Sequence, residues 1–310
     1  MANVHFDYTT VGHVSVDVTP GGARRAGGSA FYSALQAARL GQRSLIITQG
    51  VEAEIEALLA PYRSELELRV VPAGETTTLQ GTAGPAPRVQ RLLAWAGRMQ
   101  ENLEIDSSIV HLAPIARETP RRWSGSADFI GLTAQGLVRA WAGARREVHL
   151  VALAPALLPE RWDAVVISET ERESCARLIP DLPPRRAPTS GAAAAGGDAR
   201  PAPASDGSAP AAAHRGVVAV TAGAGPTSIH MPDGEIARVQ VPEIDDFCDD
   251  VGAGDVFAAA FFVALREGHS ARAAATFANA AAAVRITGAG AGAIGARAAV
   301  EARLAGIAGA

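Results

Sequence analysis

The sequence has few of the features that mark secreted, membrane-bound or nucleic-acid-binding proteins. It contains two cysteines in 310 residues and no C-x-x-C, which argues against a disulfide framework and a cysteine-rich zinc site. The formal net charge of −4 gives no basic face for nucleic acid or a lipid surface. The first residues lack a basic and apolar leader, and the longest apolar run, residues 256–265, is half of a bilayer span. We expect a cytoplasmic protein with no nucleic-acid or membrane partner.

The remaining composition is that of a protein with a large core. Hydrophobic residues make up 48% of the chain, and strand-like and helix-like segments alternate along it. This alternation is typical of βαβ units and a mainly parallel sheet. No histidine pair has metal-ligand spacing, and His111 and His149 are expected to be core residues. The predicted strands are 6–18, 44–48, 108–112, 129–132, 148–150, 164–167 and 216–221, and the first two helices are 29–40 and 52–62.

Two segments interrupt the alternation. Residues 66–93 contain strand-like runs with no helix between them, which predicts antiparallel pairing and a small β-lid over a cleft. An ordinary surface hairpin is the alternative. Residues 183–214 are rich in Ala, Pro, Gly and Ser and poor in large apolar residues, which predicts a flexible, low-complexity insertion. Because motifs on both sides belong together, we expect a single domain over residues 1–310.

The stretch Asp-Asp-Val-Gly-Ala-Gly-Asp at 249–255 precedes an apolar helix that Gly268 can close. Its small-residue turn, Gly252, Ala253 and Gly254, would leave backbone N–H groups open to an anion at the positive end of the helix dipole. Asp255 would then lie where its carboxylate can take a proton from an attacking hydroxyl. The alternative is a glycine-capped turn before a core helix, without catalysis.

This stretch resembles the D-T-x-G-A-G-D motif of the PfkB/ribokinase family of sugar kinases, with Asp250 in place of Thr. A second match lies near the start of the chain, where Gly12, Asp17 and the Gly27-Gly28 pair follow the family pattern, while Tyr32 replaces Asn. The resemblance extends from about residue 12 to residue 290. It implies an α/β fold of the three-layer ribokinase-like type, with a mainly parallel sheet flanked by helices and a small β-lid.

The resemblance also implies roles for particular residues. Asp255 would be the catalytic base, and Gly252, Ala253 and Gly254 would form the anion hole. Asp17 with the backbone of Gly27 and Gly28 would bind sugar hydroxyls, although a solvent-facing aspartate at a strand end is the alternative. Ligands gather at the carboxyl ends of parallel strands, so we add Gln135 to the acceptor side. Polar lid residues expected to face the cleft are Thr78, Gln80, Gln90 and Arg91, of which Gln80 and Arg91 are predicted to bind substrate.

On the donor side, Ser168-Glu169-Thr170-Glu171 occupies the position of the family's N-x-x-E motif, whose Glu helps to organise Mg²⁺ through water. A capping box before a helix explains Ser168 and Glu171 equally well. Thr221 and Gly223 resemble the family's T-x-G nucleotide contact, and Asn279 matches a residue near the adenine. The implied cofactors are ATP and Mg²⁺, with a monovalent cation as a further candidate.

These observations predict direct in-line transfer of the ATP γ-phosphoryl group to a hydroxyl of a sugar or polyol. Some sequences of similar pattern resemble inositol kinases, but the acceptor is not identified by the sequence. A nucleoside kinase on the same fold remains open, as does a non-catalytic sugar- or nucleotide-sensing protein, because Tyr32, Ser168 and Asp250 depart from the family pattern. A homodimer formed through the lid is a further candidate.

Overall fold

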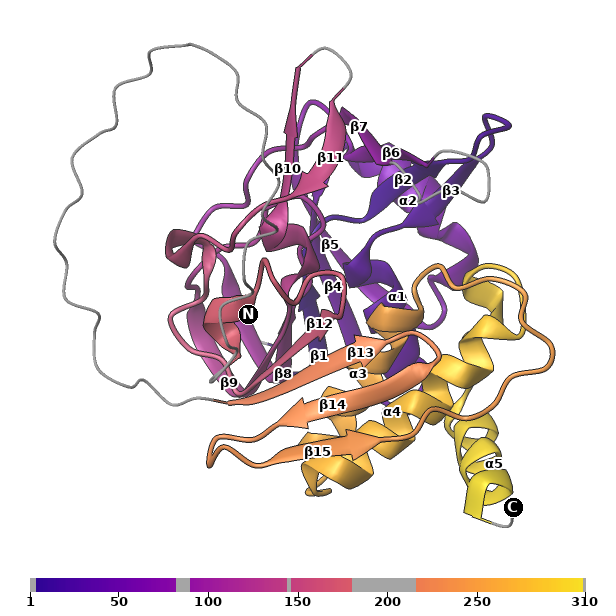
Figure 1. Ribbon diagram of the computed structural model, residues 1–310. Helices are drawn as coiled ribbons and strands as arrows, with labels where there is room; N and C mark the ends of the chain where they lie inside the picture. The colour runs from indigo at the N-terminus through magenta and orange to yellow at the C-terminus, as the bar shows by residue number, and fades with distance from the viewer. Residues whose placement is uncertain (1–3, 82–89, 144–145, 180–215, 309–310) are drawn as a thin grey trace, which may run out of the picture.

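The computed structural model describes residues 4–81, 90–143, 146–179 and 216–308 (Figure 1). The predicted insertion at 183–214 lies outside the described residues. Within them the chain forms a large, mostly parallel sheet flanked by helices and a second sheet at one end (Figure 1). The predicted α/β fold class is confirmed.

The main sheet has nine strands in the order β15-β14-β13-β12-β9-β8-β1-β4-β5. The strands from β13 to β5 pair in parallel, and β14 and β15 add an antiparallel edge. The strands are β1 (Phe6–Val11), β4 (Ser44–Gly50), β5 (Leu66–Pro72), β8 (Glu104–Leu112), β9 (Ser124–Thr133), β12 (Ala164–Ser168), β13 (Val217–Ala222), β14 (Gly225–His230) and β15 (Ile236–Val239).

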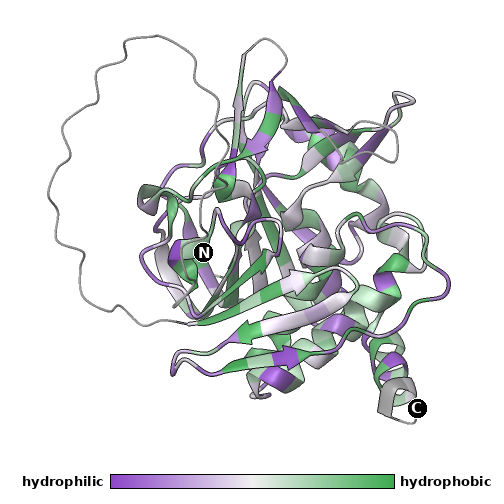
Figure 2. Ribbon diagram, in the orientation of Figure 1, coloured by the Kyte–Doolittle hydropathy of each residue, from purple (hydrophilic) through white to green (hydrophobic). Residues whose placement is uncertain are grey.

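Five α-helices contribute to one hydrophobic core with the main sheet. Helix α3 is central to it, because its apolar residues, including Phe257, Phe261 and Phe262, are almost completely buried. Each such phenylalanine contributes roughly 1.5–3 kcal/mol by burial, so the helix is a rigid support. Hydrophobic colouring accordingly follows the central strands and the helices beside them (Figure 2). The helices are α1 (Ser29–Arg39), α2 (Glu52–Leu59), α3 (Ala253–Arg266), α4 (Ala271–Ile286) and α5 (Arg297–Ala308).

A second core contains other sheet residues, among them Phe6, Val11 and Leu132. In the described part of the chain it is covered by loops and short 3-10 turns rather than by α-helices. The turns that contribute to this second core are η2 (Ala134–Val138), η3 (Pro155–Leu157) and η4 (Ala176–Leu178), whereas η1 (Ala60–Tyr62) and η5 (Ala291–Ala293) pack against the first core.

The smaller sheet is the lid, with six strands in the order β10-β11-β7-β6-β2-β3 (Figure 1). It gathers three segments that are far apart in the sequence, whereas the predicted lid was the single segment 66–93. Its strands are β2 (Ser15–Val18), β3 (Arg24–Gly27), β6 (Thr78–Gly81), β7 (Gln90–Ala94), β10 (Arg139–Ala142) and β11 (Glu147–Leu150).

Two strand assignments from the sequence are wrong. Strand β5 pairs in parallel with β4 in the main sheet, because α2 supplies the crossover that parallel pairing requires. Conversely, β11 pairs antiparallel with β10 in the lid and is not a core strand. His149 is therefore exposed, while His111 is buried and hydrogen-bonded to Tyr8 and Thr133 as a core histidine.

The predicted strand 6–18 is divided between the two sheets. It breaks at Gly12, where a Cβ would overlap the carbonyl group of Ala113. The buried carboxylate of Glu118 holds the break, because it accepts hydrogen bonds from the backbone N–H groups of His13, Ile115 and Ala116. Strands β1 and β2 thus join the main sheet directly to the lid.

Among the described residues, no helix has both the length and the apolar character needed to span a membrane.

Candidate active site

A cavity of about 270 Å³ lies between the carboxyl ends of the main strands, the lid and the start of α3. This is where open α/β sheets place their ligands. Its lining is rich in polar groups, and it includes residues from both predicted halves of the site. The lining residues are Ser15, Asp17, Gly28, Ser29, Tyr32, Leu79, Gln90, Ile115, Thr133, Gln135, Arg139, Val166, Ile167, Ser168, Glu171, Thr221, Asp250, Val251, Gly252, Gly254 and Asp255.

The start of α3 forms an open turn. Gly252 is the N-cap with φ of 81°, a left-handed conformation that favours glycine, and a Cβ there would overlap the ring of Tyr32. The N–H of Ala253 donates to the carbonyl of Asp250 at 3.1 Å, so it is not open to a ligand. Gly252 and Gly254 make no such backbone hydrogen bond to a described residue. The predicted anion hole therefore narrows to the N–H groups of Gly252 and Gly254.

Asp255 lies in the first turn of α3 and lines the cavity. Burial raises the pKa of its carboxyl from 3.8 to about 6, although a hydrogen bond from Ser29 and the charge of Arg139 pull it down. The negative charges of Glu171 and Asp17 raise it further. A carboxylate with a pKa near 6 is still ionised at neutral pH and is a better proton acceptor than an ordinary aspartate.

Arg139 is the functional candidate that the sequence analysis missed. It begins β10 and lines the cavity, and its Nη1 donates to the carbonyl of Ile115 at 3.3 Å. Its charge acts on Asp17, Glu171 and Asp255, so it is a counter-charge shared among these three carboxylates. Burial lowers the pKa of Arg139, and these carboxylates offset part of that effect. The available signal was its position four residues after Gln135, in the segment that follows a buried strand.

Asp17, the predicted acceptor-binding carboxylate, lines the cavity from strand β2. Its Oδ1 accepts a hydrogen bond from Ser15 Oγ at 2.8 Å. Burial raises the pKa of Asp17, while Ser15 and Arg139 lower it. Gly27 leaves room for this carboxylate, because a Cβ there would overlap it, and Gly28, with φ of 96°, passes close to the carbonyl of His13. Gly28 lines the cavity, whereas Gly27 acts by making space.

The lid presents Leu79 and Gln90 to the cavity, not the predicted Gln80 and Arg91. Neighbouring residues of a strand point to opposite faces, and Gln80 and Arg91 are paired on the other face. Arg91 there forms an ion pair with Glu147 at 3.4 Å. Gln135, from η2, lies where it was predicted, in the cavity lining.

Glu171 is 5% exposed and lines the cavity beyond β12. Its Oε2 accepts a hydrogen bond from the N–H of Ser168 at 2.9 Å, which is one half of a capping box. The hydroxyl of Ser168 bonds to that of Thr170 at 2.7 Å, and only turns and η4 follow in place of the expected α-helix. Without an α-helix to cap, the capping explanation for Glu171 loses force.

A second cavity of about 740 Å³ adjoins the first and is mostly apolar. Thr221, Asp250 and Gly254 line both cavities, so the two cavities meet at the start of α3. The predicted nucleotide contacts Gly223 and Asn279 also line the second cavity. The amide of Asn279 accepts from Thr227 Oγ1 at 2.9 Å and donates to the carbonyl of Gln240 at 3.1 Å, so it is firmly oriented.

No group of three or more His, Cys, Asp or Glu side chains in the described part of the chain is arranged to hold a metal. Mg²⁺ commonly takes only one or two protein carboxylates and completes its octahedron with water and substrate phosphates. Glu171 faces the cavity as a carboxylate of this kind, so the residues present fit a water-mediated Mg²⁺ site and not a protein cage.

Comparison with known proteins gives a family match for part of the chain and a match of the whole fold. Residues 204–297, which include α3 and α4, match the family profile described as pfkB family carbohydrate kinase. No curated protein sequence matches the chain.

Several solved structures share the fold over almost the whole chain. A pyrophosphate-dependent kinase of the ribokinase family, solved with a pyrophosphate analog and myo-inositol, is 20% identical, with a TM-score of 0.65 over 95% of this chain and 99% of its own. Arabidopsis thaliana ribokinase, solved with ribose and ATP, is 16% identical, with a TM-score of 0.66 over 97% and 99%. Methanocaldococcus jannaschii nucleoside kinase is 16% identical, with a TM-score of 0.66 over 97% and 98%. The resemblance to the PfkB/ribokinase family is confirmed, and the comparisons support a carbohydrate kinase.

Proposed function

We propose that this protein transfers the γ-phosphoryl group of ATP to a hydroxyl of a monosaccharide-sized sugar or polyol. The observation that carries the proposal is the meeting of two cavities at the start of α3, with Asp255 in the smaller one and Gly254 in the lining of both. A donor in one cavity and an acceptor in the other would thus face each other across the anion hole.

In this mechanism Asp255 accepts the proton of the attacking hydroxyl while the N–H groups of Gly252 and Gly254 stabilise charge on the moving phosphoryl group. Arg139 and Asp17 orient the acceptor from the side of the lid. When bound, Mg²⁺ would neutralise the donor phosphates, and Glu171 would hold it through water.

The choice of donor follows from the second cavity. Its apolar lining and volume of about 740 Å³ suit a purine and ribose, whereas pyrophosphate would need neither. ATP is therefore favoured over pyrophosphate, although three similar solved structures are described as those of pyrophosphate-dependent kinases.

The choice of acceptor follows from the first cavity. Its volume of about 270 Å³ is below the usual range for drug-sized ligands, and Tyr32 is its one aromatic lining residue. Asp17, Gln90, Gln135 and Arg139 offer several hydrogen-bonding groups, which suit a polyhydroxylated ring better than a nucleobase.

The test is a matrix of two donors, ATP and pyrophosphate, against sugars, inositols and nucleosides. ADP or phosphate release is measured and product is confirmed by mass spectrometry, with Asp255→Asn as the inactive control. We expect turnover with ATP and a sugar or inositol. Preferred turnover of a nucleoside would favour a nucleoside kinase. Saturable ligand binding without turnover by any pair would favour the non-catalytic sensor.

A further inference from the structure

A buried arginine lies beneath the turn formed by residues 252–254 at the start of α3. Arg285, in the last turn of α4, has a side chain that is 0% exposed. Its Nη1 donates to the carbonyl oxygens of Asp249 at 3.3 Å and Gly288 at 2.9 Å. Its Nη2 donates to the carboxylate of Asp249 at 3.0 Å and to the carbonyl of Val251 at 2.6 Å. One carboxylate and three carbonyl oxygens therefore converge on a single positive charge.

This cluster is joined directly to the anion hole. Val251 precedes Gly252, and the ring of Tyr32, against which Gly252 packs, lies 5.8 Å from the Arg285 guanidinium carbon. The carboxylate of Asp249 also accepts from the N–H groups of Val251 and Gly290, at 3.0 and 3.2 Å. Although burial opposes it, these hydrogen bonds and Arg285 lower the pKa of Asp249. Arg285 thus fixes the loop whose next residues hold the phosphoryl group.

The cluster also answers a problem of charge. Asp249, Asp250 and Asp255 all lie within one short stretch, where a phosphorylated donor has to bind. A buried ion pair adds little net stability, so Arg285 is poorly explained as a device for folding alone. A positive charge under the turn would reduce the repulsion between these carboxylates and the donor phosphates.

Carbonyl and carboxylate oxygens that converge in this way are the ligands that a monovalent metal cation takes in proteins. Here the oxygens already accept the N–H groups of Arg285, and its side chain fills the space between them. A potassium ion does not fit in the same place. We propose that Arg285 is a built-in replacement for a bound monovalent cation, so that the anion hole at Gly252 and Gly254 is formed without potassium. The proposal rests on the proposed function.

The test compares wild type with Arg285→Ala and with Arg272→Ala, an exposed arginine on the same helix as matched control. Rates are measured in potassium, sodium or tetramethylammonium chloride at constant ionic strength, with and without millimolar guanidinium. Wild type and Arg272→Ala should change less than about twofold between salts. Arg285→Ala should lose about tenfold or more and recover most of it with potassium or guanidinium. Potassium activation of wild type, or no loss or no rescue in Arg285→Ala, would overturn the proposal.

A second readout does not need turnover. The Tm of Arg285→Ala should rise by about 2–4 °C in potassium or guanidinium relative to tetramethylammonium, while that of wild type should not. If wild type transfers no phosphate, this arm still decides the cation question and only the proposed function fails. If Arg285→Ala does not fold, Arg285→Gln takes its place. A glutamine variant whose Tm and rate are both indifferent to potassium would contradict the proposal.

Discussion

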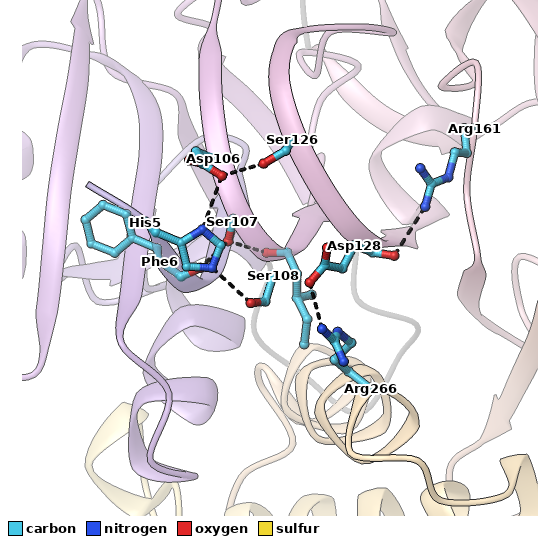
Figure 3. Close-up of polar contacts among 10 residues, drawn as sticks. His5, Phe6, Asp106, Ser107, Ser108, Ser126, Asp128, Arg161 and Arg266 are labelled. Carbon is cyan, nitrogen blue, oxygen red and sulfur yellow. Dashed lines mark hydrogen bonds and ion pairs between the residues drawn. The ribbon is translucent and has the colours of Figure 1, made fainter. Parts of the chain in front are cut away.

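Polar side chains at the two ends of the main sheet lie in contrasting environments. At the amino ends of β1, β8 and β9, polar side chains bind one another (Figure 3). His5 bonds to Asp106 at 3.1 Å and to Ser108 at 3.0 Å, Ser126 bonds to Asp106, and Asp128 pairs with Arg266 at 2.7 Å. These groups are largely exposed.

At the carboxyl ends, Glu171 is buried and Asp17 and Asp255 are partly buried, and Arg139 acts on all three through its charge. The pKa of Asp106 at the amino end is lowered, chiefly by hydrogen bonds from Ser126 and His5. The pKa of Asp255 at the carboxyl end is raised by burial. The contrast indicates that the polar side chains at the amino end satisfy one another, whereas those at the carboxyl end form a candidate ligand site.

Replacement of the base should give the largest effect. Asp255→Asn should lower kcat on the order of 10²–10⁴-fold, because it removes the proposed proton acceptor, in steady-state assays with the acceptor that the donor and acceptor screen selects. Its Tm should rise at neutral pH. A folded-state pKa of about 6 instead of 3.8 means that ionisation costs stability once the pH exceeds 3.8, by up to about 3 kcal/mol above pH 6. Asp128→Asn at the other end is the control and should retain full activity; comparable losses in both would remove the distinction between the two ends.

Gly252→Ala should have the second largest effect. A Cβ would meet the ring of Tyr32 in a backbone conformation, φ of 81°, that alanine rarely adopts. We expect a loss of about 1–3 kcal/mol in the free energy of unfolding by denaturant titration, together with a large drop in kcat. Gly234→Ala, at a left-handed turn with no atom near the added Cβ, separates conformational strain from overlap with Tyr32. Equal losses in both would mean that the contact with Tyr32 contributes nothing.

The pH dependence of kcat/KM tests whether Arg139 is a counter-charge for Asp255. In wild type, kcat/KM should rise with pH through about 6 as Asp255 ionises. Because Arg139 lowers the pKa of Asp255, Arg139→Met should move this rising limb to higher pH and raise the acceptor KM about tenfold. Arg161→Met, at the amino end, should leave the profile unchanged. A limb that stays in place would show that Arg139 does not act on the base.

Asp250 is the one acidic residue that lines both cavities. Asp250→Thr, which restores the residue of the family motif, should lower the KM for ATP several-fold because it removes a negative charge from the donor path. The measurement is the ATP dependence of the initial rate at saturating acceptor and Mg²⁺. A higher KM would instead assign Asp250 a part in holding the metal.

The smallest effect is expected from the network of Figure 3. His5→Ala should change neither kcat nor the acceptor KM, and its Tm should stay within experimental error, because the pair with Asp106 is exposed to solvent. Activity that depends on His5 would show that the amino end of the sheet also contributes to function.

The features that the sequence predicted correctly are those that depend on residues close together in the chain. The turn at Gly252, the apolar helix after it and its closure at Gly268, with φ of 91°, follow from neighbouring residues and were confirmed. The sequence could not show which residues of the lid strands face the cavity and which face away from it. A register shift between Thr78 and Leu79 sets which residues face the cavity, and it arises from pairing with β7.

Arg139 and Arg285 were missed for a related reason. Each is a single arginine at the end of an element, with no motif around it, and its role depends on partners that are distant in the chain. Asp255 lies more than one hundred residues from Arg139, and Asp249 is 36 residues from Arg285. Only the folded arrangement brings these charges together.

The break at Gly12 means that β1 of the main sheet and β2 of the lid, which lie on two sides of the first cavity, are one continuous piece of chain. Asp17 belongs to the lid, but only a few residues, fixed by Glu118, separate it from β1 in the main sheet. Any tilt of the lid must therefore carry Asp17 toward or away from Asp255. Under the proposed function, the affinity for the acceptor would depend on the position of the lid. A change at the far edge of the lid, such as the loss of the Arg91–Glu147 pair, would then weaken acceptor binding.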